Sequence, residues 1–163
     1  MATGDEALEG VEVGETGVGR FQVKARTAGG EILLDEPLSA GGTGAGPSPY
    51  DLLSTALGAC TAMTVRLYAE RKMWPLTSVV VRVVHRRDGL EAKDRFAREI
   101  VLTGPLSPEQ RARLKEIAEK CPVHRTLARG SEIGTVLAEL PFAGKLDPQP
   151  LGHCKAMDEA CRD

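Results

Sequence analysis

The chain has 163 residues, of which 42% are hydrophobic and 27% charged, a composition typical of one globular domain. Its formal net charge of −2 excludes the basic surplus of a nucleic-acid-binding protein, so we expect no nucleic-acid partner. The N-terminus lacks the basic and then apolar order of a signal peptide. The longest uncharged stretch, residues 52–65, is shorter than the roughly 20 apolar residues that span a bilayer. We therefore expect a cytoplasmic protein without a membrane partner.

The first third of the chain predicts a β-hairpin and a loop. Residues 1–10 are expected to be disordered. The stretch 11–26 predicts a strand, because apolar residues alternate towards its end. A turn follows, and Glu31–Asp35 predicts the second strand. The glycine-rich stretch 41–46 precedes the start of a helix, and glycine-rich loops in this position can bind phosphate. Its glycine spacing, however, matches no nucleotide-binding motif. We interpret it as a flexible loop that shapes a site.

A long helix follows this loop. Ser48 as cap, Pro49 at the first helical position and Asp51 three residues after the cap predict its start, and the pattern continues to about Lys72. No charge lies between Asp51 and Arg66, so we expect the helix to be buried on most sides. Its apolar stripe comprises Leu53, Ala56, Leu57, Cys60, Met63 and Leu67. The mid-helix Gly58 predicts a close approach of another backbone, for which the same helix of a second subunit is a candidate.

The rest of the chain predicts a second hairpin, a helix and a strand. In chain order the elements are strands over Ser78–Arg87 and Phe96–Thr103, a helix capped by Ser107 that ends near Lys120, and a strand over Glu132–Leu140. Hairpins separated by helices predict an α+β fold. We place the domain at residues 11–140 and a C-terminal tail at 141–163.

Two of the four cysteines are candidates for chemistry. In a cytoplasmic chain, cysteines are more often buried, catalytic or metal-binding than paired in disulfides. Cys60 is either a small core residue of the long helix or a reactive thiol. Cys121 is expected at a helix C-terminus, whose dipole disfavours a thiolate, whereas the neighbouring His124 and Arg125 favour one. The residues alone leave a redox role open.

The other histidines and cysteines have simpler interpretations. His124 either tunes Cys121 or is solvated, and His85 is expected to be structural. His153, Cys154 and Cys161 of the tail offer three ligands, whereas a closed structural zinc site needs four, so we expect no metal and no cofactor. The two tail cysteines either form a disulfide or are inert.

Two motifs resemble the OsmC/Ohr family. The run 46–61, which ends in Ala-Leu-Gly-Ala-Cys60-Thr, resembles the central helix of that family. The run 118–127, which contains Cys121-Pro-Val-His-Arg, resembles its second cysteine motif, and the resemblance extends over roughly residues 18–139. It implies an OsmC-like α+β fold, in which two sheets that contain β-hairpins wrap around a long central helix. It also implies an intertwined homodimer.

The resemblance further implies a thiol-dependent peroxidase in oxidative-stress defence. Such a protein reduces organic hydroperoxides or hydrogen peroxide, and an external dithiol is its reductant. Cys60 would be the peroxidatic residue that becomes a sulfenic acid, and Cys121 the resolving residue that condenses with it. The oxidised pair requires Cα atoms within about 7 Å of each other. A cation beside Cys60 is required to hold its thiolate.

This chain departs from the family at one position. Known members carry a glutamate where this chain has Tyr50, and that glutamate pairs with an arginine of the first hairpin. We expect Tyr50 and Asp51 to contact the substrate, although Asp51 can also serve only as a helix cap. Arg20 is the first candidate for the arginine and completes the predicted catalytic set with the two cysteines; Arg26 is the second. The departure keeps two alternatives open: a binding protein for a small apolar ligand, and a thiol sensor.

Overall fold

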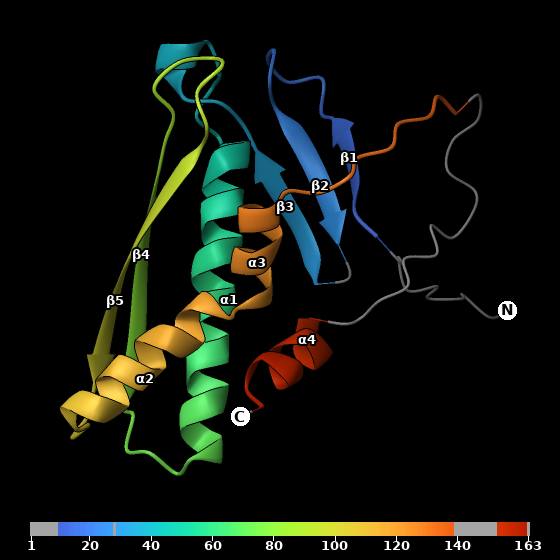
Figure 1. Cartoon of the computed structure of the whole chain (residues 1–163). Helices are drawn as coiled ribbons and strands as arrows, with labels where there is room; N and C mark the ends of the chain where they lie inside the picture. The colour runs from blue at the N-terminus through green and yellow to red at the C-terminus, as the bar shows by residue number, and fades with distance from the viewer. Residues whose placement is uncertain (1–9, 28, 139–152, 163) are drawn as a thin grey trace, which may run out of the picture. The chain divides into compact units, whose positions relative to one another are not determined.

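The computed structural model describes residues 10–27, 29–138 and 153–162. The chain divides into two units, Met1–Leu52 with Gly134–Gln149 and Leu53–Ile133 with Pro150–Asp163, and each is described by itself. Figure 1 shows one long helix and two small antiparallel sheets, which makes the fold α+β as the sequence predicts.

The first unit holds a three-stranded antiparallel sheet. Its strands are β1 (Glu12–Glu15), β2 (Val23–Thr27) and β3 (Gly30–Leu34), in the order β1-β2-β3. The predicted hairpin corresponds to β2 and β3, in which Ala25 pairs with Ile32. The sequence did not separate β1 as a strand of its own, because glycines interrupt its apolar pattern.

The glycine-rich loop is folded around a buried carboxylate. Asp35 is only 2% exposed, and its oxygens accept backbone N–H groups of Glu36 (2.8 Å), Thr43 (3.0 Å) and Ala45 (3.3 Å) and the Thr43 hydroxyl. At Gly42 an added Cβ would lie 1.9 Å from the Glu36 carbonyl oxygen, so only glycine fits. The loop's N–H groups therefore point at Asp35, and the loop, which includes the 3₁₀ helix η1 (Leu38–Ala40), is built around this residue.

Replacing Asp35 tests this arrangement. The Thr43 hydroxyl first, and then three backbone N–H groups, hold the pKa of Asp35 below its usual value. Its stabilisation is present above the ordinary carboxyl pKa and is lost as the pH falls through the lowered native value. We expect Asp35→Asn to lower the urea unfolding midpoint at neutral pH and to flatten the loss of stability on acidification. Glu36→Gln is the control; an Asp35→Asn midpoint equal to that of the native chain would contradict the prediction.

The second unit contains most of the long helix and the remaining elements. They are α1 (Pro49–Arg71), β4 (Ser78–Arg86), β5 (Arg95–Thr103), α2 (Pro108–Glu119), α3 (Pro122–Arg129) and α4 (His153–Ala160). The predicted long helix, second hairpin and second helix are confirmed to within about two residues. Both predicted caps form: Ser48 Oγ accepts the Asp51 N–H, and Ser107 makes a reciprocal capping box with Gln110.

The core of this unit surrounds α1, which packs against the β4–β5 hairpin and against α2 (Figure 1). A larger apolar cluster is centred on Val65, Ile117 and Leu114, all at most 1% exposed. Gly58 faces side chains of β4, because an added Cβ would lie 3.5 Å from Val83 Cγ2. That is an ordinary contact, so the described residues of this chain show no close backbone approach at Gly58.

One face of α1 is uncovered in the single chain. The predicted apolar stripe is buried at Leu57 and Cys60, but Leu53 is 42% and Met63 52% exposed. Ala56 and Ala59 are exposed on the same face. The expectation that this uncharged helix is buried on most sides is therefore wrong for the isolated chain, which leaves an apolar strip of four side chains open.

Two further expectations differ from the structure, and a third is hardly covered by it. The predicted strand over Glu132–Leu140 is absent from its described residues 132–138, where Leu137 is 99% exposed. Neither α3 nor α4 was predicted, and α4 lies within the predicted C-terminal tail of residues 141–163. The expected disorder of residues 1–10 falls almost wholly outside the described residues.

Among the described residues, α1 alone is long and apolar enough, by length and composition, to cross a membrane. The core helix of a globular protein meets the same test, and α1 supplies Val65, Tyr68 and Ala69 to the core. Its apolar character is explained by this packing.

Candidate functional site

Two cysteines distant in sequence meet in the second unit. Cys60 on α1 and Cys121 between α2 and α3 are 2% and 0% exposed, and both are free thiols. Together with Leu57 they form a small core cluster. Four apolar side chains surround this cluster: Val83, Phe96, Val123 and Leu127. The structure thus brings together the two sulfurs that the sequence singled out.

Cys121 occupies the start of a helix that the sequence did not reveal. Helix α2 ends at Glu119, and Cys121 is the N-cap of α3, with Pro122 at the first helical position. Its sulfur accepts the backbone N–H of His124 at 3.3 Å. The positive end of a helix dipole stabilises an anion. The expectation that the local helix end disfavours a thiolate is therefore corrected, because a second helix begins there.

An arginine on the sheet adds positive charge beside this sulfur. Arg98 of β5 donates to Thr61 Oγ1 at 2.7 Å and to the Ala118 carbonyl at 3.1 Å. Thr61 Oγ1 in turn lies 3.7 Å from the Cys121 sulfur. The guanidinium also lies 3.4 Å from His124 Nδ1. These contacts hold the cation in one position, close to the paired sulfurs.

The surroundings place the negative charge of the resting pair on Cys121. The hydrogen bond from Cys60, the His124 N–H, the Thr61 hydroxyl and the charge of Arg98 outweigh burial and lower the pKa of Cys121 to about 5. The same hydrogen bond, together with burial, raises the pKa of Cys60. The surroundings therefore favour negative charge on Cys121 over negative charge on Cys60.

Cys60 has two polar neighbours of its own besides Cys121. The backbone N–H of Val123 donates to its sulfur at 3.4 Å. The ring Nε2 of His153, the first residue of α4, lies 3.1 Å from the same sulfur. The sequence pointed to His153 only as a candidate metal ligand of the tail, because it is distant along the chain and reaches Cys60 only through the docking of α4.

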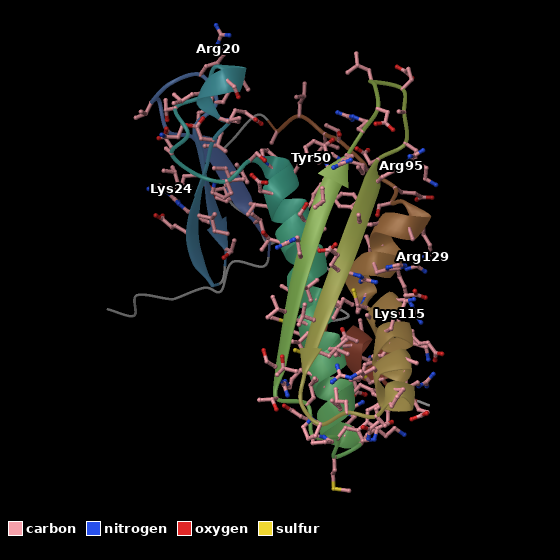
Figure 2. All side chains as sticks on the ribbon, turned by 90° about the vertical axis from the view of Figure 1, so that its left-hand side faces the viewer. Arg20, Lys24, Tyr50, Arg95, Lys115 and Arg129 are labelled. Atoms are coloured by element: carbon pink, nitrogen blue, oxygen red, sulfur yellow. The ribbon has the colours of Figure 1, made fainter. Side chains whose placement is uncertain are left out.

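A cavity of about 300 Å³ opens beside the pair. Its apolar wall is formed by Leu57, Phe96, Ile100, Leu127 and Ala128. Its polar lining is formed by Arg98, Lys115, Glu119 and His124, and Figure 2 shows Lys115 on the outer side of α2. The cavity shares Leu57 and Phe96 with the sulfur cluster, so a small, largely apolar molecule bound here would lie next to the thiols.

The predicted arginines belong to the first unit. Arg20 is exposed in the loop before β2, its guanidinium carbon lies 5.8 Å from the centre of the Phe21 ring, and Figure 2 shows it pointing outward. Arg26 on β2 pairs with Glu12 at 3.9 Å and with Glu31 at 3.7 Å. The catalytic role predicted for Arg20, with Arg26 as the second candidate, stays a prediction; within the second unit, Arg98 is the arginine that approaches the sulfurs.

Tyr50 and Asp51 lie in the first turn of α1 (Figure 2 labels Tyr50). The Asp51 carboxylate accepts both the backbone N–H (2.9 Å) and the hydroxyl (2.8 Å) of Ser48, and these bonds lower its pKa. This is the capping role that the sequence left open for Asp51. The substrate contact expected of Tyr50 and Asp51 stays a prediction.

The structure gives His85 and the tail cysteines structural rather than catalytic surroundings. His85 Nε2 lies 2.7 Å from Asp94, and the ring packs on Phe96, a structural arrangement. Cys161 is buried and donates to the Thr64 carbonyl, whereas Cys154 is exposed, so the described tail residues hold no disulfide. In the part of the chain that the structure describes, no three His, Cys, Asp or Glu side chains gather as metal ligands.

The sequence contains a signal for a functional role of Arg98, although the predicted site did not include this residue. On β5 the inward positions alternate as Phe96, Arg98, Ile100 and Leu102, so one charge occupies an otherwise apolar face. A buried charge requires partners. This irregularity in the pattern was the available signal for a functional arginine.

The comparisons with known proteins agree with this fold. The family described as OsmC-like protein matches residues 42–136, more than half of the chain. The chain belongs to the OsmC-like family. A crystal structure of an OsmC-like protein from Mycoplasma pneumoniae is 22% identical with a TM-score of 0.64, and covers 76% of this chain and 89% of its own. No curated protein matches the sequence.

Two further solved structures share the fold. A putative osmotic stress induced and detoxification response protein from Psychrobacter arcticus has 21% identity and a TM-score of 0.63, over 71% of this chain and 85% of that one. An organic hydroperoxide resistance protein from Legionella pneumophila has 22% identity and a TM-score of 0.56, over 75% and 91%. The α+β OsmC-like fold expected from the two motifs is therefore confirmed.

The charge on the sulfur pair predicts a thiolate signal at neutral pH. Because the pKa of Cys121 is lowered to about 5, its ultraviolet thiolate absorbance should be present at pH 7 and should disappear on acidification through about pH 5. Cys121→Ser should abolish this component, and Cys154→Ser, at an exposed thiol, should leave it unchanged. A native protein without thiolate absorbance at neutral pH would show that the pair is fully protonated.

Proposed function

We propose that this protein is a thiol-dependent peroxidase that reduces organic hydroperoxides or hydrogen peroxide through Cys60 and Cys121. The observation that carries the proposal is the meeting of two free, buried cysteines in one cluster, where the surroundings lower the pKa of Cys121 to about 5. A thiolate is the form of cysteine that attacks a peroxide, and a second thiol in contact can capture the product. A binding protein would not require this pairing.

The reaction balances with the two sulfurs and one external reductant. The attacking thiolate bonds to the terminal oxygen of ROOH and breaks the O–O bond. The sulfur becomes a sulfenic acid, and RO⁻ leaves as ROH after protonation. The second thiol then attacks the sulfenic sulfur, which forms a disulfide and releases water. An external dithiol restores both thiols by exchange. We assign the attack to Cys60 and resolution to Cys121, as the family resemblance implies, and the external dithiol acts in the cytoplasm.

The relatives and the cavity support this choice. The solved relatives from Legionella pneumophila and Bacillus subtilis are named organic hydroperoxide resistance proteins, the latter with 19% identity and a TM-score of 0.51. The apolar wall beside the thiols suits the organic part of a hydroperoxide, and Arg98, which also lines the cavity, would stabilise negative charge on the departing oxygen.

Turnover of a hydroperoxide tests the proposal. Purified protein should consume cumene hydroperoxide or hydrogen peroxide in the presence of a dithiol, and Cys60→Ser should lower this rate by roughly a thousandfold or more because the attacking atom is lost. Cys121→Ser should leave a sulfenic acid on Cys60 that dimedone traps. Cys154→Ser serves as the control with near-native turnover. Absence of turnover with both peroxides would refute the function.

We further propose that a second copy of the chain covers the exposed apolar strip of α1. Leu53, Ala56, Ala59 and Met63 follow one helical face without a charge. Exposed contiguous apolar surface of this kind marks an interaction site. A homodimer formed through this helix would bury the strip and would agree with the intertwined dimer that the resemblance implies.

The oligomeric state of a charged variant tests this contact. Met63→Glu places a carboxylate in the strip, and we expect it to raise the dimer dissociation constant about a hundredfold or more. Analytical ultracentrifugation over a concentration series measures this constant. Leu90→Glu, at an 89% exposed residue of the β4–β5 turn, is the matched control. A Met63→Glu protein that dimerises as the native chain does would show that the strip is not the interface.

A further inference from the structure

Helix α4 extends the site beyond the part of the chain that matches the family, which ends at residue 136. It is anchored on α1 by polar and apolar contacts. Asp158 pairs with Arg71, and the Cys161 thiol donates to the Thr64 carbonyl at 3.6 Å. Its buried residues are Met157 (8% exposed), Ala160 (3%) and Cys161 (5%). These contacts hold the first residue of α4, His153, at the start of a docked helix.

The ring of His153 reaches the reacting sulfur of Cys60. Its Nε2 lies 3.1 Å from Cys60 Sγ, which is hydrogen-bonding distance for a thiol or thiolate. Cys60 itself is 2% exposed, whereas His153 is exposed, so the ring connects the buried sulfur with solvent. No other described titratable side chain besides Cys121 hydrogen-bonds to this sulfur.

We propose that His153 is a catalytic residue of this protein, which accepts the Cys60 proton at Nε2 and so makes Cys60, rather than Cys121, the attacking sulfur. The inference rests on the peroxidase function proposed above. It resolves a conflict in the site, since the N-terminus of α3 and Arg98 favour charge on Cys121 while attack by Cys60 requires charge on Cys60. An imidazolium beside Cys60 supplies the cation that a thiolate there needs.

The proton movements balance over one turnover. The Cys60 S–H proton passes to His153 Nε2, and the resulting thiolate attacks the terminal peroxide oxygen. The sulfur loses two electrons and becomes a sulfenic acid, while the O–O bond breaks and RO⁻ leaves. The imidazolium returns its proton to RO⁻, which departs as ROH. The neutral ring is thereby regenerated before Cys121 attacks the sulfenic sulfur.

Two variants, each of which keeps only one of the two site cysteines, isolate the effect of His153. In Cys121→Ser protein, adding His153→Ala should slow iodoacetamide alkylation of Cys60 at neutral pH by about tenfold or more, because less thiolate is present. In Cys60→Ser protein, His153→Ala should leave alkylation of Cys121 unchanged within about twofold. Peptide mass spectrometry follows each sulfur separately. Lys155→Gln, an exposed change on α4, is the control that should alter neither rate.

Chemical rescue distinguishes proton acceptance from support of the fold. Since His153 is exposed, free imidazole should reach the vacated position and restore Cys60 alkylation in the His153→Ala protein, which a purely structural role would not allow. An unchanged or faster alkylation of Cys60 in that variant, or a slowing without rescue, would overturn the proposal. Alkylation needs no peroxide. Absence of peroxide turnover in the native protein would therefore refute the peroxidase function but not the acceptance of the Cys60 proton by His153.

Discussion

The structure of this site depends on two buried sulfurs that meet in one apolar cluster and on the groups that favour a negative charge there. Cys60 and Cys121 are both removed from water, and burial alone would keep both protonated. The N-terminus of α3 and Arg98 favour a negative charge on Cys121. A buried charge that would otherwise be costly is thereby retained where it can act as a nucleophile.

Two helix ends and one strand supply the groups around this pair. The first turn of α3 provides N–H groups to both sulfurs, β5 provides Arg98, and the start of α4 provides His153. Each contribution comes from a different part of the sequence, and each is fixed by packing on α1. The central helix therefore positions Cys60 and also forms the surface on which its partners assemble.

The first unit has a comparable polar centre of a different kind. Asp35 organises the glycine-rich loop from within, and glycine is required at residue 42 because the Glu36 carbonyl lies where a Cβ would be. The glycines that attract attention as a phosphate-binding pattern thus have a structural explanation. They allow the backbone to turn its N–H groups towards a carboxylate of the same chain.

The sequence by itself determined the local elements and the choice of cysteines. The caps Ser48 and Ser107 predicted where helices α1 and α2 begin, and the alternation of apolar residues predicted the β4–β5 hairpin. Two motifs around Cys60 and Cys121 indicated the family. All of these signals depend on residues close together in the chain.

The tertiary structure alone decided which side chains meet the sulfurs. His153 lies beyond a stretch without apolar periodicity. The short helix α3 begins only three residues after α2 ends, and the exposed strip of α1 has the composition of a buried one. Contacts between residues far apart in the chain depend on packing, which local patterns do not encode.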